Sequence, residues 1–306
     1  MGPLQRHVQS DSGAAVALLL GGAMWGLYWI PVRAFVEFGL TGSWPGVVMY
    51  LAALIAVLPF LWRVRRVLVL RWRGLILSGM FTGAAFSLYT TSLVYTDVVR
   101  SILLFYLTPI WGTVLGILVL GERLYPQRAI GLICGVGGLF IVLGGNQGIP
   151  WPRNAGDWLA LTSGVAWALG SLGLYRARGI PIPGQVFAFV SGALIVAGVG
   201  IAVELRLGQL IPTHQILMGA APYAAVSAVF VLPMLFLTIW PATMLSPARV
   251  GLLLMSEVVV GLVSAALLSG EPFGWREALG AVLIVGAAVL ELMPRRSSFQ
   301  SGVDQT

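Results

Sequence analysis

Residues 101–143 read SILLFYLTPIWGTVLGILVLGERLYPQRAIGLICGVGGLFIVL, and residues 250–292 read VGLLLMSEVVVGLVSAALLSGEPFGWREALGAVLIVGAAVLEL. Aligned without a gap, the two stretches are identical at 12 of 43 positions, so the chain contains an internal repeat. Each half of the chain holds five apolar segments. Because five is odd, the second copy must lie inverted relative to the first in a membrane. Inverted repeats of this kind build many secondary transporters, with the binding site near mid-membrane between the halves.

The composition excludes a soluble protein. Apolar residues make up 58% of the 306 residues, charged residues only 9%, and the mean hydropathy is +0.93, values that no soluble domain of this size would tolerate. The alternation that a membrane β-barrel needs is absent. We therefore expect an all-α integral membrane protein with ten transmembrane helices in two inverted five-helix repeats. The predicted spans lie near residues 14–37, 44–62, 74–95, 98–120, 128–146, 155–175, 183–203, 215–240, 248–268 and 275–293.

Short links between the spans leave no room for a soluble catalytic domain. Residues 1–306 are expected to form a single membrane domain, with repeat one at about 14–146 and repeat two at about 155–293. The chain has no lysine, and a topology with both termini inside places 13 of its 18 arginines on the inner side. This positive-inside bias predicts cytoplasmic N- and C-termini.

Both copies share a glycine-rich pattern at the same place. The first reads Gly121-Glu122…Ala129-Ile130-Gly131…Gly137, and the second reads Gly270-Glu271…Ala278-Leu279-Gly280…Gly286. The pattern resembles the EamA repeat of the drug/metabolite transporter superfamily, over essentially the whole chain. Within the superfamily the chain is most similar to the YddG-type exporters of aromatic amino acids. This resemblance implies alternating access around a central cavity, although Val258 stands where the family often has a proline.

Aromatic and hydroxyl side chains in the first and sixth spans are candidates for the wall of that cavity. Trp25 and Trp29 lie four residues apart on one helix face, and Tyr28 adjoins them. The second half has Ser163 and Trp167 on the corresponding face. Such side chains suit an amphipathic solute. The alternative interpretation is helix packing or an interfacial aromatic belt.

The third and fourth spans carry further candidates. Tyr89 lies in an unusually polar stretch, and polar side chains in hydrocarbon normally turn to a neighbouring helix or to water. Tyr106 and Trp111 flank Pro109, which frees a backbone carbonyl one turn earlier. The predicted hinges are Pro31, Pro109 and Pro233.

Glu257 is an acidic residue near the middle of the ninth span. Its insertion there costs on the order of 2.5–3.5 kcal/mol, so another interaction must offset that cost. We expect it to face the cavity, where it bonds the amino group of a substrate or carries a proton. The alternative is a carboxyl group bonded to a neighbour such as Ser256 or Thr108, which would only fix helix packing.

The sequence contains no pattern typical of membrane enzymes, such as HExxH, a cysteine pair or a phosphate-binding loop. We therefore expect no enzyme activity, no catalytic residue, no metal site and no cofactor. A channel filter or a ring of like charges is also missing. Phosphate-ester substrates would need buried basic residues, whereas every arginine lies in a link or near a span end.

The sequence thus predicts a secondary transporter that exports aromatic and other neutral amino acids and related small metabolites across the cytoplasmic (inner) membrane of a bacterium. The alternative is an exporter of lipophilic cations, like the small multidrug carriers, or of another small metabolite. A hydroxyl-lined surround of Glu257 would favour zwitterions, and a bare aromatic cage would favour cations. The expected partners are the substrate and the lipid bilayer, without nucleic acid. The sequence does not determine the exact substrate, the direction of transport, its coupling to protons or the oligomeric state. A monomer is compatible with it.

Overall fold

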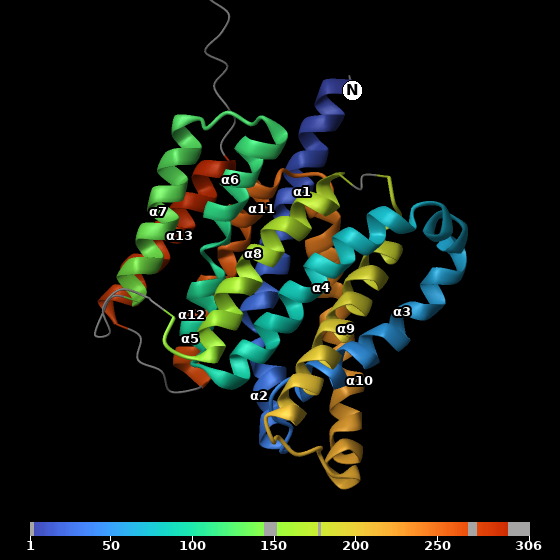
Figure 1. Cartoon of the computed structure of the whole chain (residues 1–306). Helices are drawn as coiled ribbons and strands as arrows, with labels where there is room; N and C mark the ends of the chain where they lie inside the picture. Colours follow the sequence, from blue (N-terminus) through green and yellow to red (C-terminus); the bar gives the residue numbers. More distant parts are fainter. Residues whose placement is uncertain (1–2, 144–151, 177–178, 269–273, 293–306) are drawn as a thin grey trace, which may run out of the picture.

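The protein is a bundle of helices. The computed structural model describes residues 3–143, 152–176, 179–268 and 274–292, and all regular structure in these parts is helical (Figure 1). The helices are α1 (Pro3–Gly26), α2 (Trp29–Glu37), α3 (Trp44–Leu70), α4 (Trp72–Tyr95), α5 (Val98–Phe105), α6 (Thr108–Leu120), α7 (Pro126–Leu143), α8 (Ala155–Arg176), α9 (Ile182–Arg206), α10 (His214–Ala242), α11 (Pro247–Leu254), α12 (Ser256–Leu268) and α13 (Trp275–Leu292). The all-α prediction is confirmed for this part of the chain.

Several of these helices are long and apolar enough to cross a membrane, because lipid offers backbone groups no other partner. Six such stretches occur within the described residues: Asp11–Glu37, Trp44–Trp62, Ala155–Arg176, Ile182–Arg206, His214–Ala242 and Pro247–Leu268. The count of ten spans and the cytoplasmic termini stay predictions. The second copy of the Gly-Glu motif, at 270–271, lies outside the described residues.

Three of the predicted spans are each divided into two helices by a break of one or two residues: α1 from α2, α5 from α6, and α11 from α12. At each break a tighter hydrogen bond spans three residues, as in a 3₁₀ turn. The bonds run from the N–H of Tyr28 to Trp25 O (2.9 Å), from Leu107 to Leu104 O (3.4 Å) and from Met255 to Leu252 O (3.2 Å).

Two of the predicted hinge prolines lie beside such breaks. Pro31 lies in the first turn of α2, and Pro109 occupies the start of α6, where a missing N–H costs least. Pro233 lies inside α10, which continues through it without interruption. The third break, at Met255, has no proline. It was not predicted, although Met255, which follows α11, aligns with Tyr106, which follows α5 at the second break.

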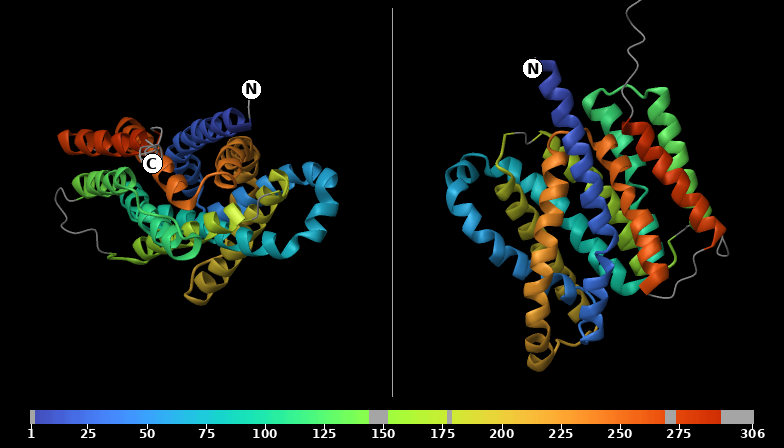
Figure 2. Two further views of the ribbon diagram at one scale, coloured as in Figure 1. Left: turned by 90° about the horizontal axis from the view of Figure 1, so that it is seen from above. Right: turned by 180° about the vertical axis from the view of Figure 1, so that it is seen from behind.

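The helix boundaries repeat along the chain. α11 begins and ends 149 residues after α5, and α13 begins and ends 149 residues after α7, the same offset as in the sequence repeat. The packing is reciprocal as well: α7 packs on α13 and α3 on α9, while α4 contacts α8 and α9 and α10 contacts α1 and α3. Figure 2 shows α7 and α13 side by side at one edge of the bundle. A two-fold repeat predicts this pattern.

Both ends of the described chain lie on one side of the bundle. The start of α1 and the end of α13 occupy the same end in Figures 1 and 2. We call this end the terminal face and the other end the opposite face. Under the predicted topology the terminal face would be cytoplasmic.

Candidate functional site

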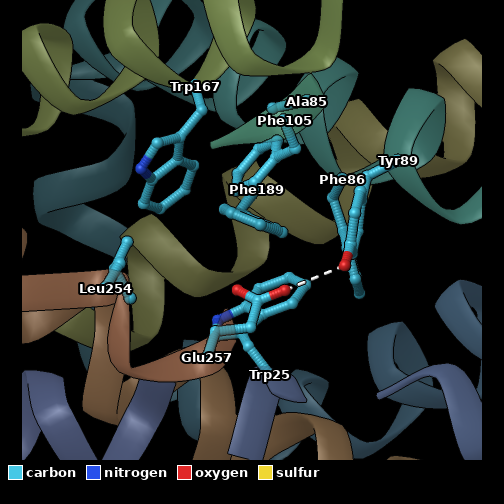
Figure 3. A pocket seen from close by; sticks show the side chains of 9 residues that line it. All are labelled: Trp25, Ala85, Phe86, Tyr89, Phe105, Trp167, Phe189, Leu254 and Glu257. Atoms are coloured by element: carbon cyan, nitrogen blue, oxygen red, sulfur yellow. Dashed lines mark hydrogen bonds between the residues drawn. The ribbon is translucent and has the colours of Figure 1, made fainter. Parts of the chain in front are cut away.

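A small cavity lies between the two halves of the chain, close to the three helix breaks. Its wall is drawn from α1, α4, α5, α8, α9, α11 and α12, so both repeats contribute. The lining residues are Trp25, Ala85, Phe86, Tyr89, Phe105, Trp167, Phe189, Leu254 and Glu257 (Figure 3). Its volume is about 20 Å³, which is room for about one water molecule. A solute of amino-acid size therefore enters only after the halves move apart.

Glu257 is the acidic group of this cavity, and it is 1% exposed. Its Oε1 accepts a hydrogen bond from the Tyr89 hydroxyl at 2.8 Å, and its Oε2 accepts one from the Tyr106 hydroxyl. The break at Met255 places Glu257 in the first turn of α12, where free backbone N–H groups and the helix dipole favour a carboxyl group. Two hydroxyls and a helix N-terminus thus offset the cost of burial.

The second and third helix breaks lie against each other. The single hydroxyl proton of Tyr106, the residue that follows α5, is shared between two acceptors: the carbonyl oxygen of Leu254, at 2.7 Å, and the Glu257 carboxyl group. Leu254 is the last residue of α11. The hydroxyl of Tyr106 therefore joins the breaks of equivalent spans in the two halves, at the wall of the cavity.

Trp25 and Trp167 occupy equivalent places in the two halves but differ in their bonding. The indole Nε1 of Trp25 donates to Thr238 Oγ1 at 3.0 Å. The indole Nε1 of Trp167 has no hydrogen-bond partner among the described residues, although the side chain is only 4% exposed. Figure 3 shows Trp167 across the cavity from Glu257. The cavity wall thus includes one acidic side chain and one tryptophan whose indole N–H is unpaired.

Other predicted site residues lie next to the cavity rather than in its wall. The Tyr28 hydroxyl shares a hydrogen bond with Thr90 Oγ1 at 2.8 Å, and Trp29 Nε1 donates to Ser264 Oγ at 3.0 Å. The buried Ser163 bonds to a carbonyl of its own helix. These side chains are already paired in this state.

Trp111 does not line the cavity, contrary to what the sequence suggested. Its side chain is 37% exposed and is not among the residues that line the cavity. Tyr106, on the other side of Pro109, faces inward and bonds Glu257. Flanking a proline therefore did not place the two aromatic residues on one face.

Sequence reasoning missed three phenylalanines of the wall and one buried acid. Phe86, Phe105 and Phe189 line the cavity, and Phe86 was accessible to prediction because it lies three residues before Tyr89 on the same helix face. Glu204, one residue beyond the predicted end of a span, is 8% exposed. It accepts hydrogen bonds from the backbone N–H (3.1 Å) and the hydroxyl (2.9 Å) of Ser43.

No three histidine, cysteine, aspartate or glutamate side chains in the described parts of the chain come together as a metal site. The cavity wall is instead aromatic, with hydrogen-bonding groups from one tyrosine, two tryptophans and one glutamate. A wall of this composition suits an amphipathic solute.

Comparisons with known proteins identify one domain of the chain. Residues 12–144 match the EamA-like transporter family. An EamA-like transporter domain is present. The uncharacterized protein PA1977 of Pseudomonas aeruginosa is 31% identical over 180 residues, which are 58% of this chain and 59% of that relative. A crystal structure of another protein aligns over 92% of this chain and 96% of its own, with a TM-score of 0.62 and 20% identity, so this likeness concerns the fold alone.

The EamA-like domain covers the first predicted repeat and supplies Trp25, Phe86, Tyr89 and Phe105 to the cavity wall. The family is described as one of transporters. The domain, together with the apolar helices, indicates a multi-pass membrane protein. The resemblance to the EamA family seen in the sequence is thus confirmed for this domain.

Proposed function

We propose that the whole chain is a secondary transporter made of two inverted EamA-type repeats, which moves amino acids with aromatic or other neutral side chains by alternating access. One observation carries the proposal: the carboxyl group of Glu257 is held by two tyrosine hydroxyls in the wall of an aromatic cavity between the halves. We place the protein in the inner membrane of a bacterium, as an exporter.

The acid supports a substrate that bears an amino group. Glu257 is the acidic residue of the cavity wall, and an acidic group inside a membrane protein usually serves a ligand or a proton. Its two tyrosine hydroxyls are donors, and hydroxyls can rotate away when a substrate ammonium arrives. The aromatic rings then supply a flat apolar surface for the side chain.

Trp167 supports a second polar end on that substrate. Its unpaired indole N–H lies in the cavity wall and donates only, so it suits a hydrogen-bond acceptor such as a carboxylate. A buried donor left without a partner costs about 1–3 kcal/mol, and a bound carboxylate would recover that cost. An acceptor end beside Trp167 and an ammonium beside Glu257 match a zwitterion.

The second candidate is an exporter of lipophilic cations. It is favoured by the wall itself, because Trp25, Phe86, Phe105 and Phe189 line the cavity together with Glu257, and the faces of aromatic rings bind cations without needing an acceptor. The two candidates differ in one group: a lipophilic cation makes no use of the N–H of Trp167.

The test is uptake of radiolabelled tryptophan or phenylalanine into proteoliposomes of the purified protein, against empty liposomes, with and without a pH gradient. Saturable uptake is expected, and Glu257→Gln should lower it by about tenfold or more, while Trp111→Phe, on the bundle exterior, should not change it. Absence of saturable uptake under both conditions would refute the amino-acid assignment.

Trp167→Phe separates the two candidates, because it removes the N–H while keeping an aromatic ring. For an amino-acid transporter we expect the KM for tryptophan to rise several-fold, by about 1 kcal/mol of lost hydrogen bonding. For a cation exporter, transport of tetraphenylphosphonium would be found and would be unaffected by the substitution. Transport of tetraphenylphosphonium alone would select the second candidate.

A further inference from the structure

Two arginine–aspartate pairs join helices of different halves at the two ends of the bundle. At the opposite face, Arg100 Nε lies 2.6 Å from Asp157 Oδ2, and this pair is buried, with side-chain exposures of 11% and 0%. At the terminal face, Arg249 Nη1 lies 3.8 Å from Asp11 Oδ2, with exposures of 19% and 50%. The Arg100–Asp157 pair is therefore short and buried, whereas the Asp11–Arg249 pair is longer and partly exposed.

The two pairs are related by the repeat. Arg100 and Arg249 lie at the third position of α5 and α11, two equivalent helices 149 residues apart. Their partners lie near the starts of α8 and α1, which contain the equivalent Trp167 and Trp25. In that register Asp11 falls one helical turn before the counterpart of Asp157, on the same helix face. Each pair therefore links the same two elements of the fold, at opposite ends.

Other polar contacts between the halves lie at the same end of the bundle as the Arg100–Asp157 pair. Asp157 also accepts a hydrogen bond from Thr96 Oγ1 at 2.9 Å. The Glu204–Ser43 and Trp29–Ser264 bonds likewise lie toward the opposite face and join the two halves. These contacts lie close to the short Arg100–Asp157 pair at the opposite face, whereas the equivalent Asp11–Arg249 pair at the terminal face is longer and more exposed.

We propose that Arg100–Asp157 and Asp11–Arg249 are reciprocal latches: each closes one end of the cavity, and they form in alternation during the transport cycle. The inference rests on the proposed transport function. Two states that differ by one closed pair exchange readily only when a similar pair forms in the other state, and the repeat provides that pair. Neutralising one latch therefore shifts the population toward the state in which its end is open.

The experiment measures cysteine accessibility, so it needs no substrate and no transport. In a Cys134→Ala background, Leu93→Cys reports on the opposite face. Leu93 is 1% exposed, lies one turn from Tyr89 and borders a cleft of about 260 Å³. Ala242→Cys reports on the terminal face; it is fully buried and lies one turn beyond Thr238, the partner of Trp25. Maleimide labelling rates are measured in detergent, where the reagent reaches both faces.

The two neutralising variants are expected to act with opposite signs. Asp157→Asn should raise the labelling rate of Leu93→Cys by about fivefold or more and lower that of Ala242→Cys. Asp11→Asn should do the reverse. Arg100→Lys replaces Asp157→Asn if the latter does not reach the membrane, and should give the same signs with smaller changes.

The latch proposal is overturned if Asp157→Asn and Asp11→Asn change the labelling rate of a given reporter cysteine in the same direction, or if neither variant changes it. Loosened packing, in contrast to a latch, raises the labelling rates of both reporters together. Opposed changes without any uptake of amino acids or cations would leave the latches standing and refute the proposed substrate instead. Size-exclusion profiles of all variants serve as the folding control.

Discussion

The close approach of α4 and α9 can be tested at a single glycine. A Cβ atom placed on Gly83 would lie 2.3 Å from Ala193 N, 2.5 Å from Gly192 C and 2.6 Å from Phe189 O. All three are backbone atoms of α9, which no side-chain rotation can move away. Ordinary contact needs about 3.5 Å, so Gly83→Ala must push the two helices apart by about 1 Å.

The magnitude follows from two opposing terms. Overpacking costs typically 1–3 kcal/mol, and three backbone overlaps place this site at the upper end, about 3 kcal/mol. Alanine in a helix is favoured over glycine by about 1 kcal/mol. The net expectation is a loss of about 2 kcal/mol of stability.

The matched control is Gly198→Ala, also in α9, whose added Cβ meets nothing within 4 Å. This variant should gain up to about 1 kcal/mol. Thermal unfolding of both purified variants in detergent, followed by circular dichroism, gives the comparison. A midpoint for Gly83→Ala at or above that of the unsubstituted protein, with Gly198→Ala behaving as expected, would refute the α4–α9 packing described above.

Three further outcomes follow from the same structure. Tyr106→Phe loses bonds to Glu257 and to a backbone carbonyl, so it should lower stability by about 1.5–3 kcal/mol, and more than Tyr89→Phe, which loses one; equal unfolding midpoints would contradict this. Gly42→Ala should destabilise by about 1–2 kcal/mol, because its φ is +60° and its Cβ would lie 2.5 Å from Glu204 Oε2. Gly208→Ala is the control, because Gly208 has a φ of +90° and a Cβ there would meet no atom within 4 Å, so this variant measures the cost of the positive φ alone. An equal loss of stability in both variants would show that the contact with Glu204 contributes nothing. Trp111→Ala should leave transport within about twofold, since the side chain is outside the cavity; a large loss of uptake would contradict its placement.

Much of the helix layout was accessible to sequence reasoning. The predicted spans 155–175, 215–240 and 275–293 agree within two residues at either end with α8, α10 and α13. Apolar runs specify their own extent, because a chain in lipid must satisfy its backbone groups within each helix. The repeat also contains a signal for the helix break at Met255, because Met255 aligns with Tyr106, where the equivalent span of the first half is broken.

The site depended on rotations and crossings that no local pattern encodes. Glu257 was recognised as costly from its position alone. The packing alternative named neighbours such as Ser256 or Thr108, whereas the hydroxyls of Tyr89 and Tyr106 bond to it. In this chain the lipid-facing and inward-facing sides of a helix are both apolar, so periodicity says little about which side faces the cavity.

By itself, the sequence determined that this protein is helical, spans a membrane and contains an internal repeat, because hydropathy and duplication are properties of the chain. Only the tertiary structure decided that Trp167 lines the cavity with an unpaired indole N–H while Trp111 faces outward. It also decided that Arg100 lies 2.6 Å from Asp157 whereas Arg249 lies 3.8 Å from Asp11. These differences arise from how far each helix end lies from its neighbour, and two halves of similar sequence can differ in that distance.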